Sequence, residues 1–211
     1  MDLTNAIPSL LAFGPQTGLP SQDTVEQLRL QLNRTPQLSH VFDSIKSLTD
    51  FWNTLVNFDP SLSHIPGTQI FTDLQRWVVE GGPLPSHNTN TYLVPVTVLL
   101  QITQYFGYLK QLNTRNPQQR VIQSLQNGSI QGFCVGFLSA ATVATSKTEA
   151  EIASTAAVII RLAVCIGAYV DKAQLGSHSV GAACIAVRWK EDEVSEGEIV
   201  GLVHTFPGVS C

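Results

Sequence analysis

Cys134 stands between two glycines, Gly132 and Gly136, each two positions away from it. The segment 129–131 before this pentapeptide is short and partly apolar, as in a buried strand. Residues 137–144 are small and apolar, as in a tightly packed helix. A strand, a sharp turn and a helix with a reactive side chain on the turn make a nucleophile elbow, here with cysteine in place of the commoner serine. Such a turn brings backbone segments close together, so the flanking positions must lack a Cβ.

A cysteine at this position can attack an acyl group and form a thioester. The N-terminus of the helix that follows favours the thiolate, and the backbone N–H of Val135 is expected to hold the oxyanion. A second N–H is expected from the loop 14–17, because loops that end parallel strands converge on one edge of the sheet. From the pentapeptide alone, Cys134 is equally well a small buried residue in a helix start rich in glycine and alanine.

The composition limits the classes of partner. The 211 residues are 44% hydrophobic and only 13% charged, with a net charge of −4, whereas a typical soluble domain has about 25% charged residues. This balance supplies no basic field for nucleic acid or for an anionic membrane. The first residues lack a signal-peptide pattern, and the apolar run 153–170 predicts a core helix and no membrane span. The four cysteines have neither paired nor metal-type spacing, which indicates a reducing, cytoplasmic compartment and no metal site.

The chain before the elbow is predicted to be mostly helical. A short apolar strand at 9–13 leads into the loop 14–17. Capping residues and apolar spacing then predict helices at 21–34, 39–56, 68–80 and 91–112, followed by a polar connector at 113–119. Few strands with large helical insertions favour an α/β layer architecture.

After the elbow, the sequence pattern changes once, from that of an apolar helix to that of an alternating strand. A capping box at Ser146–Glu149 starts a helix that is apolar nearly all round, is therefore central, and ends near Val170. Residues 180–190 alternate as in a half-buried strand. The change near residues 174–179 predicts a first domain at 1–175 and an incomplete second unit at 176–211, which is too short to close a core of its own.

Four segments occur in an order known from one family: Phe13–Thr17, Asn90–Thr97, Gly132–Gly136 and Ala182–Trp189. With them the chain resembles the starter-unit acyl-carrier-protein transacylase domain of fungal non-reducing polyketide synthases. The resemblance implies an α/β acyltransferase fold: a hydrolase-like large subdomain with a short parallel sheet and many helices, into which a ferredoxin-like small subdomain is inserted, and of which this chain holds only the start. It also implies that Cys134 is the nucleophile and that the backbone N–H groups of Gln16 and Val135 form the oxyanion hole.

The resemblance further implies the substrates and partners of this secondary-metabolism transferase. No bound cofactor is expected; the acyl group comes from an acyl-CoA or a phosphopantetheinyl acyl carrier protein. The expected partners are an acyl carrier protein or a polyketide or fatty-acid synthase, with no nucleic acid and no membrane. The alternative is a truncated, non-catalytic module of the same type that binds a carrier protein or synthase.

The family uses a histidine base, which is expected beyond the last residue of this chain. His87 and His178 lie in loops able to approach the elbow, and the simpler interpretation of both is a surface histidine. Arg161 falls near the place of the carboxylate-binding arginine of related malonyl-transferring enzymes, but its register differs. A surface residue is the simpler interpretation there too, which favours an uncharged acyl starter.

Overall fold

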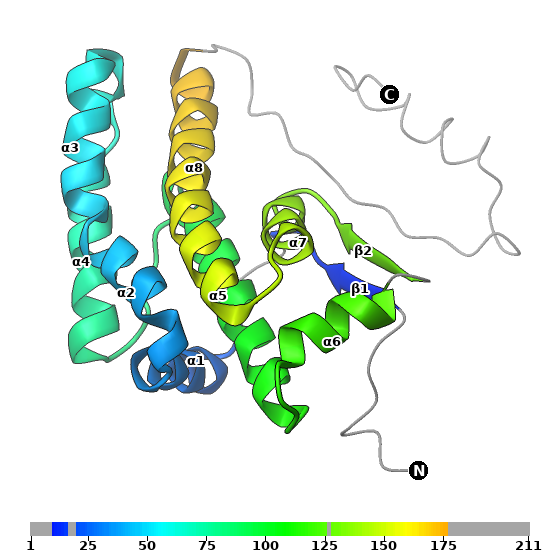
Figure 1. The fold of residues 1–211 in the computed structure, drawn as a ribbon. Coiled ribbons are helices and arrows are strands. Elements are labelled where there is room, and N and C mark those ends of the chain that lie inside the picture. The colour runs from blue at the N-terminus through cyan, green and yellow to red at the C-terminus, as the bar shows by residue number, and fades with distance from the viewer. Residues whose placement is uncertain (1–9, 17–19, 126–127, 177–211) are drawn as a thin grey trace, which may run out of the picture. The chain divides into compact units, whose positions relative to one another are not determined.

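The computed structural model describes residues 10–16, 20–125 and 128–176, and Figure 1 shows how their helices and strands are arranged. The chain divides into two units, Met1–Gly176 and Ser177–Cys211, and every described residue belongs to the first. The strand predicted at 180–190 and the small subdomain therefore lie outside the described residues. Their assignment stays a prediction.

Two short strands form a parallel pair, β1 at Leu10–Phe13 and β2 at Ser129–Gly132. In their register Leu10 is opposite Ser129 and Phe13 is opposite Gly132. A parallel pair needs a crossover connection, and here that connection consists of helices. The α/β class with a short parallel sheet and many helices is thus confirmed, while the acyltransferase fold stays a prediction.

Four helices precede the long central helices, and they lie in the three regions, 21–34, 39–56 and 68–80, for which the apolar spacing predicts helix. Ser21 caps the first of them, since its hydroxyl oxygen accepts a hydrogen bond from the N–H of Thr24 at 3.4 Å. The fourth ends at Gly81, whose φ of 88° suits a glycine. The four are α1 at Gln22–Arg34, α2 at Ser39–Lys46, α3 at Leu48–Phe58 and α4 at Gly67–Glu80, with 3-10 turns at Pro36–Leu38 and Pro60–His64.

The prediction of one helix over 39–56 is wrong, because the helix is broken at Ser47 into α2 and α3. The Ser47 hydroxyl donates to the carbonyl oxygen of Ser44 at 2.8 Å. Its N–H is shared between the carbonyl oxygens of Asp43 and Ser44, at 3.2 and 3.1 Å. A serine that bonds to the preceding turn competes with the regular helical ladder. The apolar spacing continues across the break, so periodicity does not reveal it.

Helices α5, at Asn90–Gln111, and α8, at Glu149–Gly176, lie side by side in the middle of the unit (Figure 1). They approach closely at Gly167, where an added Cβ would lie 2.2 Å from the carbonyl oxygen of Asn90. Because other helices also cover α5, its buried surface is wider than the predicted stripe and includes Tyr92, Val94, Val98, Ile102 and Tyr105.

Helix α8 is central, as predicted, but it runs past Val170 to Gly176 and only part of its apolar surface is buried. Its alanine-rich face is buried on α5, whereas its opposite side exposes a row of large apolar residues: Val158, Leu162, Ile166, Tyr169 and Val170. By length and composition Glu149–Gln174 could span a membrane, with a mean hydropathy of 1.9 and 44% of its most apolar stretch buried in the unit. A core helix has the same properties, and the packing of α8 on α5 favours that interpretation.

The start of α8 differs from the predicted capping box, which is two residues too early. Thr148 Oγ1 accepts a hydrogen bond from the N–H of Glu151 at 3.2 Å, and the Glu151 carboxylate accepts one from the N–H of Lys147 at 2.6 Å. The Ser146 hydroxyl instead donates to the carbonyl oxygen of Thr142 at 2.7 Å. Glu149 accepts from the N–H of Gln118 at 3.2 Å, so a distant contact displaces the local one.

The polar connector predicted for 113–119 is shorter than expected, because helix α6 begins within it and covers Pro117–Ser124. Asn116 precedes the helix in the left-handed conformation, with a φ of 58°. Pro117 then takes the first helical position, where its missing N–H leaves no hydrogen bond unmade. Gln118 is fully buried, and its side-chain amide donates to the carbonyl oxygens of Val143 and Ser146 at 3.1 and 2.8 Å.

Candidate active site

The pentapeptide around Cys134 forms a strand, a turn and a helix. Strand β2 ends at Gly132, yet the N–H of Phe133 still bonds to the carbonyl oxygen of Phe13 at 3.0 Å. The N–H of Gly136 then donates to the carbonyl oxygen of Phe133 at 3.0 Å, and helix α7 begins there and runs over Gly136–Thr145. Cys134 has a φ of 55°, a left-handed conformation that non-glycine residues adopt rarely and at a cost in free energy.

Both flanking glycines are required by close backbone contacts. An added Cβ at Gly132 would lie 2.4 Å from the Cα of Phe137. At Gly136 it would lie 2.3 Å from the carbonyl oxygen of Phe13 and 2.5 Å from that of Gly14. All three contacts are with backbone, which cannot rotate away as a side chain can. The spacing of the glycines in the sequence therefore has a steric cause.

The Cys134 thiol is exposed at an open helix N-terminus. No side chain caps α7, and the N–H groups of Cys134 and Val135 have no backbone partner among the described residues. Unpaired N–H groups at such a place can bind a negatively charged oxygen. Cys165 on α8 is different, because it is half-buried and its burial raises the pKa of its thiol.

The loop that holds Gln16 lies beside the start of α7, since Gly136 packs on the carbonyl oxygens of Phe13 and Gly14. Gln101 of α5 holds the same loop, because its Nε2 donates to the carbonyl oxygen of Gly14 at 2.8 Å. Gln16 and Val135 therefore follow two strands that end at one edge of the sheet. Their N–H groups remain a predicted oxyanion hole. Sequence reasoning missed Gln101, because one polar residue on a long helix has no pattern that marks its partner.

Neither histidine predicted near the elbow has a described contact with it. The Nε2 of His87 lies 3.5 Å from an oxygen of Asp73 on α4, and its ring packs edge-on against Tyr92 of α5, with 5.1 Å between ring centres. His178 lies outside the described residues. A base is therefore not assigned by geometry.

Arg161 is exposed and makes its described contacts with the region where α2 meets α3. Its Nη2 donates to the hydroxyl oxygen of Ser47 at 3.1 Å, and its guanidinium carbon lies 6.0 Å from the centre of the Phe51 ring. These contacts agree with the interpretation of Arg161 as a surface residue.

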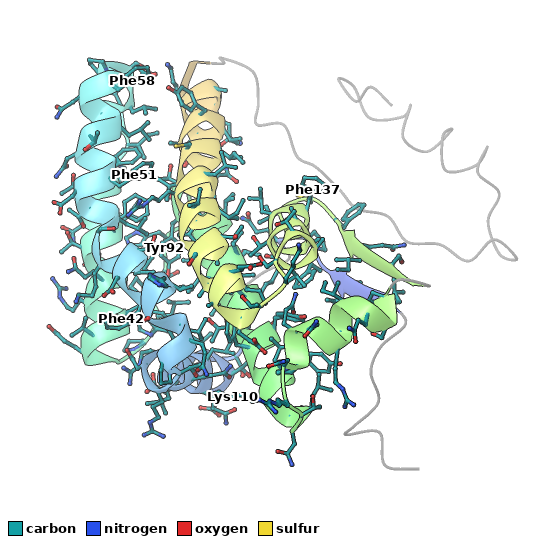
Figure 2. The ribbon with its side chains drawn as sticks, viewed as in Figure 1. Phe42, Phe51, Phe58, Tyr92, Lys110 and Phe137 are labelled. Atoms are coloured by element: carbon teal, nitrogen blue, oxygen red, sulfur yellow. The ribbon has the colours of Figure 1, made fainter. Side chains whose placement is uncertain are left out.

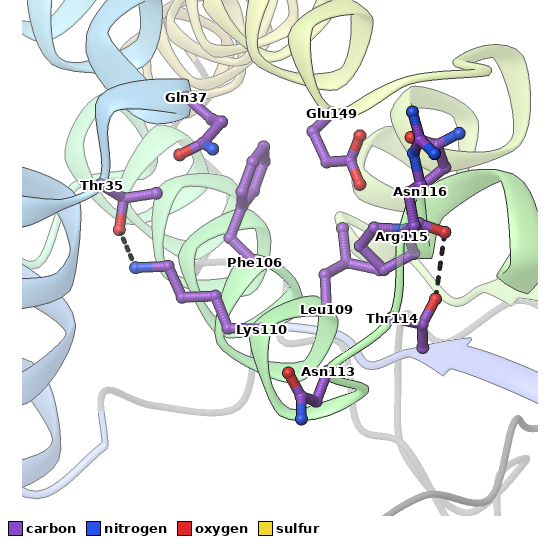
Figure 3. A pocket seen from close by; sticks show the side chains of 11 residues that line it. Thr35, Gln37, Phe106, Leu109, Lys110, Asn113, Thr114, Arg115, Asn116 and Glu149 are labelled. Carbon is purple, nitrogen blue, oxygen red and sulfur yellow. Dashed lines mark hydrogen bonds between the residues drawn. The ribbon is translucent and has the colours of Figure 1, made fainter.

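Two cavities of the described region lie away from the elbow. One, of about 580 Å³, borders α3 and α4 around Trp52 and Asn53. The other, of about 530 Å³, lies between the end of α5, the start of α6 and Glu149, and contains the hydrogen bond from Lys110 Nζ to Thr35 Oγ1 at 2.6 Å (Figure 3). A smaller cavity of about 280 Å³ is the one beside the candidate site, with Gly14 and Gln101 in its lining. Within residues 10–16, 20–125 and 128–176, no three His, Cys, Asp or Glu side chains gather to hold a metal ion.

The chain matches one protein family and a set of curated fungal proteins. The family model is described as "Starter unit:ACP transacylase in aflatoxin biosynthesis" and matches residues 13–196. Methylphloroacetophenone synthase of Cladonia uncialis is 40% identical over 96% of this chain and 8% of its own length. Non-reducing polyketide synthase esdpA of Penicillium shearii is 36% identical, over 95% of this chain and 9% of that protein. For 5-methylorsellinic acid synthase of Aspergillus terreus the values are 35%, 95% and 8%. The chain thus spans about a tenth of the length of these relatives.

Proposed function

This chain belongs to the starter unit:ACP transacylase family, and from that premise we propose that it moves a starter acyl group to an acyl carrier protein through Cys134. The acyl donor in this proposal is a thioester of coenzyme A or of a carrier protein, and no bound cofactor takes part. The observation that carries the proposal is an exposed thiol in a left-handed turn at the open N-terminus of α7. The proposed location is the cytoplasm, where thiols stay reduced.

In the first half-reaction, the Cys134 thiolate forms a bond to the carbonyl carbon of the donor thioester. The carbonyl oxygen takes the negative charge, and the N–H groups of Val135 and Gln16 are the proposed donors that stabilise it. When the carbonyl re-forms, the bond to the donor sulfur breaks and the donor leaves as a thiolate, which takes a proton from water. Cys134 then carries the acyl group as a thioester.

In the second half-reaction, the phosphopantetheine thiolate of the carrier protein attacks this thioester. The bond between Cys134 Sγ and the acyl carbon breaks, and the Cys134 thiolate is regenerated. The exchange is nearly balanced in energy, because the attacking and leaving thiols are alike. A general base that deprotonates the incoming thiol contributes about 10²–10⁴-fold. Since no described histidine contacts the elbow, acylation of Cys134 is the step to measure first.

The test is the mass of the intact chain after incubation with acyl-CoA donors. We expect a mass increase of one acyl group, located on Cys134 by peptide mapping. The adduct should disappear in Cys134→Ala and persist in the control Cys165→Ala, because the Cys165 thiol is half-buried on α8. Absence of an adduct with every donor tried would refute the proposal. Carrier-protein binding without any adduct would point to the non-catalytic binding module.

A further inference from the structure

The edge of β1 that faces away from β2 has unpaired backbone groups. On the β2 side, the carbonyl oxygen of Phe13 accepts a hydrogen bond from the N–H of Phe133 at 3.0 Å. The next carbonyl oxygen, that of Gly14, accepts one from Nε2 of Gln101 on α5 at 2.8 Å. Successive carbonyl groups of a strand point to opposite sides, so the N–H and carbonyl of Ala12 are directed to the α5 side. Outside the strand pair, no described group bonds to them.

A cavity of about 280 Å³ follows this edge. It is bordered by residues 11–14 and by four residues on one face of α5, at the spacing i, i+3, i+4 and i+7: Gln101, Gln104, Tyr105 and Tyr108. A water molecule takes up about 30 Å³, so the cavity has room for a larger group. Because a strand and a helix face border it together, it suits an extended occupant.

Two buried polar atoms of the lining residues have no partner. They are Oε1 of Gln101 and the hydroxyl of Tyr108, and neither has a hydrogen-bond partner among the described residues. A buried polar atom that stays unpaired costs free energy. Together with the backbone groups of Ala12, these atoms give the cavity both donors and acceptors for an occupant.

The lining of the cavity contains no charged residue, so an ionic ligand would lose hydration there without gaining a counter-charge. A peptide backbone is neutral and presents N–H and carbonyl groups in alternation, which is what the edge of a sheet binds. A two-stranded sheet also gains stability from a further strand or from a helix packed on it. Helix α7, whose first turn is marked by Phe137 in Figure 2, packs on the pair, while the edge of β1 stays unpaired.

We propose that the edge of β1 beside α5 is a docking site for an extended, uncharged polypeptide strand, which adds to the pair as a third strand. The chain spans about a tenth of the length of its relatives, and the remaining length of such a synthase is the proposed source of this strand. The proposal does not depend on acyl transfer through Cys134.

The first test is a binding map with short overlapping peptides that tile the methylphloroacetophenone synthase of Cladonia uncialis, which is 40% identical to this chain. We expect the intact chain to bind peptides that alternate apolar and uncharged polar residues. Ala12→Pro should weaken this binding at least about tenfold, because proline has no N–H to donate. The variant should fold, since proline is tolerated on an edge strand where its position faces away from the partner.

Ala12→Val is the matched control, because valine keeps the N–H and suits a strand. It should bind the same peptides as tightly as the wild-type chain does. Far-UV circular dichroism checks that both variants fold. If no peptide binds, or if Ala12→Pro binds the same peptides as tightly as Ala12→Val, the proposal is overturned.

A second variant, Tyr108→Phe, separates docking from a structural role and does not depend on the folding of Ala12→Pro. The Tyr108 hydroxyl has no described partner, so its removal should leave Tm of the free chain unchanged or raise it. Peptide binding should weaken about fivefold, because the strand loses a hydrogen bond. A lower Tm with unchanged peptide binding would contradict the proposal.

Sedimentation of the chain without peptide tests the other possible occupant, a second copy. We expect the wild-type chain and Ala12→Pro to sediment with the same mass. A dimer that Ala12→Pro abolishes would place a second copy on the edge of β1 and would overturn the proposed source of the strand.

Discussion

Helices α5 and α7 begin in opposite ways. At the start of α5, the carboxylate of Asp171 on α8 accepts four hydrogen bonds: from the N–H and Nδ2 of Asn90, both at 2.9 Å, and from the N–H and Oγ1 of Thr91, at 2.7 and 2.6 Å. Asp171 is only 7% exposed. At the start of α7 no side chain caps the helix, and the residue at the turn is the exposed thiol of Cys134.

The difference shows how one physical feature serves structure in one place and chemistry in another. The first N–H groups of a helix lack intrahelical partners and attract negative charge. At α5 a carboxylate of the chain itself satisfies them, which ties α8 to α5. At α7 the first N–H groups bond back to the turn, and the N–H groups of Cys134 and Val135 just before the helix have no backbone partner among the described residues. Each start is also packed through a glycine, Gly167 against Asn90 and Gly136 against Phe13 and Gly14.

The largest effect is expected from adding a side chain at the uncapped start of α7, which we call the open end. Gly136→Ala puts a Cβ 2.3 Å from a backbone oxygen of Phe13, so we expect a loss of about 3–5 kcal/mol in the free energy of unfolding and no acyl adduct on Cys134. Urea unfolding and intact mass measure the two effects. Gly14→Ala is the control, because an added Cβ there meets nothing within 4 Å. If the two variants are equally stable, the steric account of the elbow is wrong.

A smaller loss of stability is expected from removing the Asp171 carboxylate that caps the start of α5, which we call the closed end. Asp171→Ala leaves buried donors of Asn90 and Thr91 without a partner, which should cost about 2–3 kcal/mol in the free energy of unfolding. The folded fraction should still acylate Cys134 at the wild-type rate. Asp23→Ala is the control, since Asp23 is an exposed acid in the first turn of α1 and its loss should change stability by about 0.5 kcal/mol or less. Equal effects of the two variants would contradict a structural role for the closed end.

The two described cysteines should differ in reactivity. Cys134 is exposed, whereas burial shields Cys165 and raises the pKa of its thiol, so less of it is thiolate at neutral pH. We expect iodoacetamide to label Cys134 at least about tenfold faster, as followed by peptide mapping. In denaturant the two rates should become equal. Faster labelling of Cys165 than of Cys134 in the folded chain would contradict the exposure of Cys134 at the start of α7.

The smallest effect is expected at the surface contact between α8 and the end of α3. Lys172 Nζ donates to Asp59 Oδ2 at 2.8 Å, and this hydrogen bond, with a second from Ser61, holds the pKa of Asp59 well below its usual range. A lowered pKa stabilises the folded state at pH values above the ordinary carboxyl value of about 4, and the stabilisation is lost as the pH falls below it.

Lys172→Met should therefore lower Tm slightly at pH 7, with the difference from wild type shrinking as the pH falls from about 5 to about 2. Lys46→Met is the control, because Lys46 and Asp43 are an exposed pair 4.0 Å apart and such pairs contribute little. A Lys172→Met difference that grows on acidification would contradict the sign of the Asp59 shift.

The elements that short patterns specify are predicted well. Ser21 caps α1, Gly81 ends α4, and the strands β1 and β2 lie where the apolar runs are. Each of these depends on neighbours within a few residues. The start of α8 is mispredicted because a distant residue determines it. The Glu149 carboxylate accepts a hydrogen bond from the N–H of Gln118 on α6, and Thr148 caps α8 instead. The break at Ser47 is local, but a hydroxyl bond to the preceding turn is invisible to apolar spacing.

The candidate site also has some features that the local sequence determines and others that the tertiary structure determines. The spacing of Gly132, Cys134 and Gly136 by itself determined the turn, because a backbone that passes this close to itself excludes a Cβ at two positions and strains the third. The tertiary structure decided which helix start is closed and which is open, since Asp171 reaches Asn90 across 81 residues of chain. It also decided that Gln101 holds the Gly14 loop and that Phe133 and Phe137 stay exposed. Burial and capping depend on partners that only the folded chain brings together.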